Sequence, residues 1–264
     1  MNGKTGLALL FSLGIAMTAG TSEAAHIDSY RNIILQGDYT IRYDNITPAP
    51  RVTNRDRMDL FGSSGMAVNR NDYLTNRQKT GIVTSNGKDR YEEVGDGEFN
   101  MCRLKKGGET FVFTKYKKGD GYEYFGSKKG KVEANSRNAL AELVSGESYG
   151  DPEFSVVLNA MLPDSAKSAD MPRFALVKSG TLSNGLSYED YKAAKEGMTH
   201  IIRYYFDGTD LVKIASAAYY RKENGQLDGH KCIIKIREFS SLPDRKLLSL
   251  PEGLEDVTKR KGKE

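Results

Sequence analysis

Gly37-Asp38-Tyr39-Thr40-Ile41-Arg42-Tyr43-Asp44 has the residue pattern from which the fold class of this chain is predicted. Its apolar and aromatic residues alternate with polar ones. In an extended chain Tyr39, Ile41 and Tyr43 therefore fall on one face, and the polar residues fall on the other. A period of two is typical of a half-buried β-strand. The sequence predicts a strand here with one apolar face.

The same alternation recurs along most of the chain. Further strands are predicted at residues 81–85, 90–94, 98–104, 110–116, 122–125, 174–179, 198–206, 211–221 and 230–239. Several of them are separated by short glycine-containing turns such as Asn86-Gly87 and Asp96-Gly97. Because these dipeptides readily supply the positive φ of two-residue hairpin turns, an antiparallel meander is the simplest topology.

The periodicity changes to that of helices between residues 135 and 164. Ser136 can cap one helix, and Asp151-Pro152-Glu153 can open a second that stops at Pro163. Two amphipathic helices between β blocks must pack on a sheet. The predicted fold class is α+β: a curved, mainly antiparallel sheet, forming a half-open β-barrel, with a helical insertion at about 136–162 packed as a lid.

The first 24 residues have the layout of a secretory signal peptide. Lys4 precedes an apolar run from Gly6 to Ala19, and Ser22-Glu23-Ala24 forms a small-residue exit. A membrane anchor would need roughly 20 apolar residues, which this run does not reach. We expect residues 1–24 to be cleaved and residues 25–264 to form one β-rich binding domain. That domain is expected in the periplasm or outside the cell, and not as an integral membrane protein.

Composition argues against nucleic acid, metal ions and cofactors. The net charge is only +4, and the basic residues gather in the tail at 259–263 instead of forming a basic face with aromatic residues for stacking. The three histidines, His26, His200 and His230, lack the spacing that aims two ligands at one metal. We therefore expect no cofactor, no metal and no nucleic-acid partner.

No enzymatic motif is complete. Gly62-Ser63-Ser64-Gly65 is one residue too short for the nucleophile elbow of a serine hydrolase. Glu92 and Glu93 are adjacent on a predicted strand, so they point to opposite faces and cannot flank one sugar bond. We expect a protein without catalytic residues, although a hydrolase site assembled from residues distant in sequence stays an alternative.

The two cysteines, Cys102 and Cys232, both lie in strand-like segments. An exported protein permits a disulfide between them, and we favour that interpretation. The alternative is that each thiol is a small apolar core residue.

Pairs of aromatic and aliphatic residues follow the predicted strands at a spacing of two. These pairs either fill a solid core or line an unfilled apolar concavity that holds a ligand. The 15 tyrosines and the absence of tryptophan suit a lining that offers both apolar area and hydroxyl groups. The candidate lining residues are Phe111, Phe113, Tyr122, Tyr124, Ile202, Tyr204 and Phe206.

The carboxyl-terminal part resembles the closing block of LolA-like lipoprotein carriers and the wider LolA-LppX-type periplasmic lipid-binding superfamily. The resemblance rests on an aromatic strand and turn at residues 204–214, on Ile236-Arg237-Glu238-Phe239, and on the tail Leu247-Leu248-Ser249-Leu250-Pro251-Glu252-Gly253. It covers about 50 residues at motif strength. It implies a half-open antiparallel barrel with helices as a lid over an apolar cavity that takes acyl chains or hydrophobic partners.

The sequence therefore predicts an exported cell-envelope protein that binds a lipid or another apolar ligand non-covalently. The alternative is a protein–protein interaction module of the envelope, with a solid core and a sheet edge or face that binds its partner.

Overall fold

The computed structural model describes residues 25–46, 79–132, 152–163, 167, 172–195, 197–221 and 227–256. The signal peptide predicted at 1–24 and the helix predicted from Ser136 lie outside these residues. The described elements, in chain order, are α1 (Ile27–Gln36), β1 (Asp38–Asn45), β2 (Lys79–Asn86), β3 (Arg90–Gly95), β4 (Phe99–Lys106), β5 (Glu109–Lys118), β6 (Gly121–Gly126), β7 (Lys131–Val132), α5 (Pro152–Met161), β8 (Ala175–Thr181), β9 (Ser187–Lys195), β10 (Met198–Asp207), β11 (Asp210–Arg221), β12 (Leu227–Ser240) and β13 (Glu255–Asp256).

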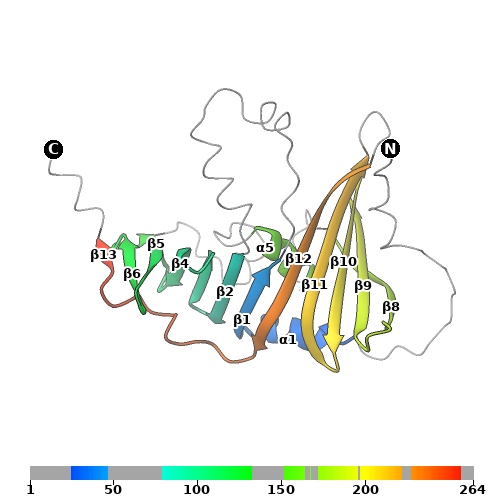
Figure 1. Ribbon diagram of the computed structural model, residues 1–264, viewed down its shortest axis with the longest axis horizontal. Coiled ribbons are helices and arrows are strands. Elements are labelled where there is room, and N and C mark those ends of the chain that lie inside the picture. The colour runs from blue at the N-terminus through cyan, green and yellow to red at the C-terminus, as the bar shows by residue number, and fades with distance from the viewer. Residues whose placement is uncertain are drawn as a thin grey trace.

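One 13-stranded sheet contains all the described strands (Figure 1). Its order is β13-β6-β5-β4-β3-β2-β1-β12-β11-β10-β9-β8, and β7 pairs with β5 beside this path. All pairs are antiparallel except the short parallel pair of β13 with β6. The sheet is curved and open, because β13 and β8 end the path without pairing with each other. The prediction of a mainly antiparallel α+β protein is confirmed at this level.

The predicted strands and turns agree with the described residues, but four described elements were not predicted. Gly87 and Gly97 adopt positive φ in the turns predicted there, and Gly208 does so in the turn between β10 and β11. The elements that were not predicted are helix α1, strand β9 and the two-residue strands β7 and β13. The second predicted helix is confirmed as α5, which begins at Pro152, a favoured first residue, and ends shortly before Pro163.

The two halves of the sheet bury opposite faces. Ile41 pairs with Val83, whereas the next residue of β2, Thr84, pairs with Tyr91. Because neighbouring residues of a strand point to opposite faces, Val83 and Tyr91 belong to different faces. We call the face of Ile41 and Val83 the inner face and the face of Thr84 and Tyr91 the outer face.

The first core covers the inner face of β1, β2 and β9–β12. Helices α1 and α5 both pack on this face, and Figure 1 shows both on the same side of β10–β12. The inner face of β3 and β4 is different, because it carries the buried charged residues Arg90, Glu92, Arg103 and Lys105. The apolar floor of the first core therefore ends near β2.

The second core covers the outer face of β3–β5. Its cover is the carboxyl-terminal segment, residues 241–254, which we call the strap. The strap leaves β12 and crosses to β13 at the far edge of the sheet, over about 34 Å at the usual strand spacing (Figure 1). Leu248 and Leu254 of the strap are buried in this core.

Hydroxyl groups of the sheet hold the start of the strap. Thr40 Oγ1 donates to the Leu242 carbonyl at 2.7 Å, and the Asp244 amide donates to Thr40 Oγ1 and to Thr84 Oγ1, both at 2.9 Å. Further along, Lys106 Nζ donates to the Leu248 carbonyl at 2.9 Å. The Leu-Leu-Ser-Leu-Pro-Glu-Gly tail therefore has a structural role, which is to close the second core.

Candidate functional site: the helix-covered inner face

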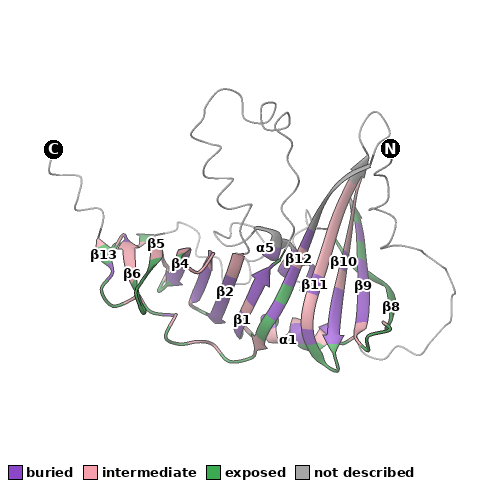
Figure 2. Ribbon diagram, in the orientation of Figure 1, coloured by how far each residue is buried: buried purple, intermediate pink, exposed green. Residues whose placement is uncertain are grey.

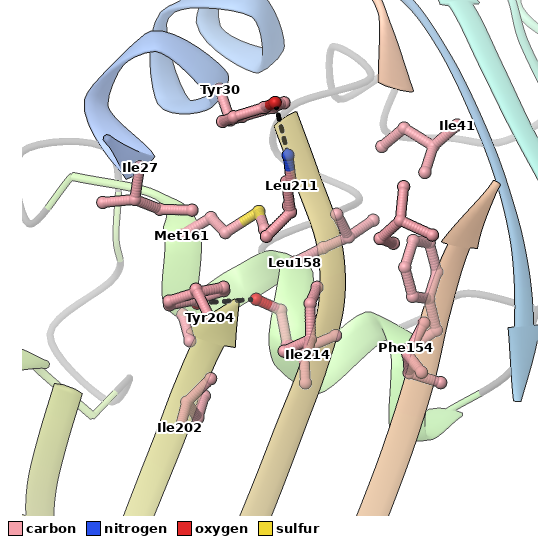
Figure 3. Packing of buried hydrophobic residues seen from close by; sticks show 14 of the residues in the cluster. Ile27, Tyr30, Ile41, Phe154, Leu158, Met161, Ile202, Tyr204, Leu211 and Ile214 are labelled. Carbon is pink, nitrogen blue, oxygen red and sulfur yellow. Dashed lines mark hydrogen bonds between the residues drawn. The ribbon is translucent and has the colours of Figure 1, made fainter. Parts of the chain in front are cut away.

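Helix α5 lies on the floor formed by the inner face of the sheet. It contributes Phe154, Val157, Leu158, Ala160 and Met161 to the first core, and each of them is at most 2% exposed. The floor consists mainly of side chains from β1, β10, β11 and β12. Figure 3 shows Leu158 and Met161 packed toward the strand residues Tyr204 and Ile214. One apolar helix thus covers a floor that strands from the two ends of the chain build together.

Aromatic stacking anchors the start of α5. The ring of Phe154 stacks on that of Tyr43, with centroids 3.7 Å apart and planes 20° from parallel. The Tyr43 ring in turn lies across Gly81 of β2, where a Cβ atom would fall 2.1 Å from the Tyr43 Cζ atom. Only glycine leaves room for the Tyr43 ring, so the stacking of Phe154 on Tyr43 depends on the lack of a side chain at position 81.

Among the described residues, two hydrogen bonds attach α5 to other elements. Arg31 Nε of α1 donates to the Met161 carbonyl at 2.7 Å, and the Tyr204 hydroxyl donates to the Val157 carbonyl at 3.4 Å. Asn159 Oδ1 is buried and has no hydrogen-bond partner. A buried acceptor left without a partner costs about 1–3 kcal/mol. The attachment of α5 is therefore mainly apolar and includes an unsatisfied polar atom.

Helix α1 is fixed more firmly than α5. Ile27, Tyr30 and Ile34 point into the first core, and the helix ends at Gly37, which adopts a φ of 87°. The Tyr30 hydroxyl donates to the Thr209 carbonyl at 2.9 Å and accepts from the Leu211 amide at 2.7 Å (Figure 3). These two bonds tie α1 to the turn between β10 and β11, so α1 serves as a fixed wall of the site.

A small polar group borders the floor beside α1. The Tyr191 hydroxyl donates to Glu189 Oε2 at 3.2 Å, and the His26 backbone amide donates to Glu189 Oε1 at 2.6 Å. Burial raises the pKa of Tyr191 and of Tyr204, because a phenolate is poorly solvated in the core. Both hydroxyls therefore stay protonated and act as hydrogen-bond donors. The floor therefore combines apolar area with a few fixed polar groups.

The predicted lining residues are divided between the two cores. Ile202, Tyr204 and Phe206 are buried in the first core, under the helices. Phe111 and Phe113 are buried in the second core, and Tyr124 packs against it. Tyr122 is 45% exposed. The structure therefore places only the three residues of β10 under the helices, and it groups Phe111, Phe113 and Tyr124 at the second core.

The second core contains a hydrogen-bonded polar network instead of a floor for a ligand. Glu93 accepts hydrogen bonds from the Tyr91 hydroxyl at 2.6 Å, from Asn100 Nδ2 at 2.6 Å and from Lys115 Nζ at 2.8 Å. Tyr91 also contacts Cys102 Sγ at 3.3 Å. Burial, followed by the charge of Glu93, raises the pKa of Cys102 to about 12, so it stays a neutral thiol and a poor nucleophile.

The predicted disulfide between Cys102 and Cys232 is wrong. Cys102 lies in the second core on β4, and Cys232 lies in the first core on β12. Four strand spacings separate β4 from β12 in the sheet, which is about 19 Å. A disulfide needs Cα atoms within about 7 Å. The alternative interpretation, that each cysteine is a core residue, describes the structure.

One further sequence prediction, about Glu92 and Glu93, agrees with the structure. Glu92 and Glu93 do point to opposite faces, since Glu92 pairs with Arg90 at 2.5 Å while Glu93 joins the network of the second core. Asp207 and Asp210 bracket the tight turn between β10 and β11.

Among the described residues, no group of three His, Cys, Asp or Glu side chains is placed to hold a metal ion. Neither helix of the described part of the chain is long and apolar enough to span a membrane.

Sequence reasoning missed the residues of α1. Ile27, Tyr30 and Ile34 have a spacing of three and four, which is a helical signal, and Gly37 is a typical residue to end a helix. These four residues could have located the helix.

Comparisons with known proteins do not place the chain in a family. A scan against protein-family models and a search of curated proteins each find no match.

Proposed function

We propose that this protein is an exported cell-envelope protein that binds a lipid or another apolar ligand non-covalently on the inner face of its sheet. In this proposal α5 is a lid that moves from the floor when the ligand enters. The curved sheet acts as a half-open barrel, as the resemblance to LolA-like carriers implies. No covalent chemistry is involved.

The main support for this proposal is the way α5 packs on the inner face of the sheet. Its core-facing side chains are apolar, and its described attachments to other elements are two hydrogen bonds, one of them long. A ligand chain that replaced Leu158 and Met161 would bury the same floor of Tyr204 and Ile214. The exchange would cost little apolar burial, and it would also free Asn159 Oδ1 from its unsatisfied position.

The polar groups around the floor also support a ligand with one polar end. The hydroxyl of Tyr204 donates to a helix carbonyl while α5 is in place, and it becomes available to the ligand when α5 leaves. An apolar chain with a hydrogen-bond acceptor at one end fits this arrangement best. Fatty acids and the acyl groups of lipids have that chemistry.

The experiment is the binding of an apolar fluorescent probe, N-phenyl-1-naphthylamine, to the wild type and to Leu158→Gln. Loss of the buried Leu158 side chain should weaken the seat of α5 by about 2 kcal/mol or more. Because apparent affinity scales with the population of the open state, probe affinity should rise by about tenfold or more. Leu35→Gln is the matched control, since Leu35 lies on α1 and is 41% exposed. It should bind the probe as the wild type does.

Two results would contradict the proposal. One is that the folded wild type does not bind the probe and Leu158→Gln unfolds the whole sheet, as judged by far-ultraviolet circular dichroism. The other is that Leu158→Gln keeps the native spectrum without any gain in probe binding. In either case α5 is a permanent part of the core.

The alternative function, an interaction module, has one specific observation in its favour. Strand β8 ends the sheet path, and all seven of its residues are exposed, including Leu176 and Val177 (Figure 2). An exposed edge of this kind can pair with a strand of another protein. However, β8 contains a bulge between Leu176 and Lys178, and bulges and lysines are common protections against such pairing. This alternative therefore ranks second.

A further inference from the structure

The outer face of β8–β12 is basic, whereas the inner face of the same strands is the apolar floor. Alternation along each strand places Tyr188, Arg203, Tyr205 and their cross-strand neighbours on this outer face. The cations on it are Lys178, Lys192, Arg203, Lys213, Lys235 and Arg237, and the carboxylates are Asp44, Asp190 and Glu238, together with Asp207 and Asp210 at the β10–β11 turn. Cations thus outnumber carboxylates on this face.

Three of these carboxylates are already bound by arginines, and Arg42 Nε of β1 donates to Glu238 Oε2 at 2.9 Å. Arg203 holds Asp190 through two hydrogen bonds of 2.6 and 2.7 Å, and Arg237 Nε donates to Asp44 at 2.7 Å. Four lysines remain, and no carboxylate of the described residues forms an ion pair with any of them: Lys178, Lys192, Lys213 and Lys235. They lie on four different strands from β8 to β12, which spread over about 19 Å.

Tyrosine rings fix part of this face. The guanidinium of Arg203 lies 4.3 Å from the ring centre of Tyr188, and Lys213 Nζ lies 4.8 Å from that of Tyr205. Both rings are only 8% exposed. The cations therefore rest on aromatic rings carried by a rigid sheet, and the positive charge is held in a fixed, two-dimensional array.

We propose that this outer face docks the protein onto an anionic phospholipid surface. An array of lysines spread over four strands matches an extended charged surface better than the line of phosphates of a nucleic acid. The choice of a membrane over an acidic protein rests on the proposed function, because a protein that binds lipid must meet the bilayer that supplies or receives it. In the docked state the apolar floor lies on the side of the sheet away from the basic face, so the two surfaces act separately.

The experiment is co-sedimentation with sucrose-loaded vesicles of phosphatidylcholine alone, or with 30 mol % phosphatidylglycerol, at 0.1 M NaCl. The wild type should bind the anionic vesicles and release them at 0.5 M NaCl. Each lysine near an anionic surface is worth about a fivefold change in partitioning, so K178Q/K192Q/K213Q/K235Q should lose binding by about two orders of magnitude or more. The four arginine substitutions at the same positions should keep it.

The matched control is K88Q/K128Q/K129Q/K246Q, which removes the same charge from exposed lysines elsewhere on the described surface. It should keep at least a tenth of the wild-type binding. Equal binding to both kinds of vesicle, or equal loss in both quadruple variants, would overturn the proposal. Strong binding to heparin without binding to anionic vesicles would also overturn it and indicate a soluble polyanion.

A failure of the docking proposal can be distinguished from a failure of the proposed binding of an apolar ligand. The four lysines point away from the floor, so K178Q/K192Q/K213Q/K235Q should bind N-phenyl-1-naphthylamine as the wild type does and melt at the same temperature. If the wild type binds the probe but no anionic vesicles, only the docking proposal falls. If it binds vesicles but no probe, the apolar site falls and the basic face stands.

Discussion

Strands β9–β12 and strands β3–β5 belong to one sheet, yet they bury opposite faces under covers of different kinds. The first group is covered by two helices and meets them through apolar contacts and few hydrogen bonds. The second group is covered by the strap and contains the Glu93 network, in which the carboxylate has three partners. In the proposed function α5 is the cover that leaves, whereas α1 and the strap stay in place.

The largest expected effect comes from the same substitution made in each core. Phe113 and Phe154 are 3% and 2% exposed. Phe113→Ala should lower the free energy of unfolding by about 3–5 kcal/mol, as is usual for an aromatic residue lost from a packed core. If α5 acts as the proposed lid, Phe154→Ala should cost clearly less, because it weakens only the packing of α5 on the sheet. Urea denaturation measures both, and equal costs would remove the distinction between the two cores.

The Glu93 network should come next. Glu93→Gln leaves the ammonium group of Lys115 without its carboxylate partner, and the Lys115 side chain is 13% exposed. We expect a loss of about 2–3 kcal/mol, somewhat below the cost of breaking a fully buried pair. Asp190→Asn, which breaks the ion pair with Arg203 on the outer face of the other half, is the comparison and should cost less. The reverse order would show that the second core does not depend on its network.

The strap should respond to a smaller change. Thr84→Val removes a hydroxyl that accepts from the Asp244 amide while keeping the shape of the side chain. We expect a loss of about 1–2 kcal/mol and faster proteolysis of residues 241–256. Limited trypsin digestion followed by mass spectrometry detects this cleavage. An unchanged digestion pattern would mean that the leucines alone hold the strap.

The smallest expected effect is a change of stability with pH in the part of the sheet that the helices cover. Burial lowers the pKa of His200 below its usual value near 6.5, because the imidazolium is desolvated. The unfolded chain then takes up the proton at a higher pH than the folded one. Stability is therefore full above about pH 6.5 and falls as the pH drops through and below that value. His200→Gln should flatten this part of the pH–stability curve, and an unchanged curve would assign the acid loss to other groups.

Much of the fold could be predicted because alternation and turn chemistry are local signals. The Asn-Gly and Asp-Gly turns located the hairpins, and the prolines at 152 and 163 bounded α5. The buried face of each strand was harder to assign. In β5, Phe111 and Phe113 alternate with Thr110, Val112 and Thr114, and this pattern does not show which segment covers the face of the two phenylalanines. In the structure the strap covers it.

The candidate site could be predicted only in part for a related reason. Ile202, Tyr204 and Phe206 were identified from the pattern of β10, and the structure places them on one floor. These residues share the floor with side chains of β1, from the other end of the chain, because β1 pairs with β12. No local pattern encodes this pairing. The same long-range pairing keeps Cys102 and Cys232 apart.

Native mass spectrometry of the protein purified from its own cells tests directly whether a ligand binds under α5. We expect a bound mass of several hundred daltons that is lost on denaturation. The fraction of protein that carries this mass should be lower for Tyr204→Ala than for the wild type. A mass equal to the polypeptide alone, unchanged after incubation with a total lipid extract, would contradict a ligand site under α5.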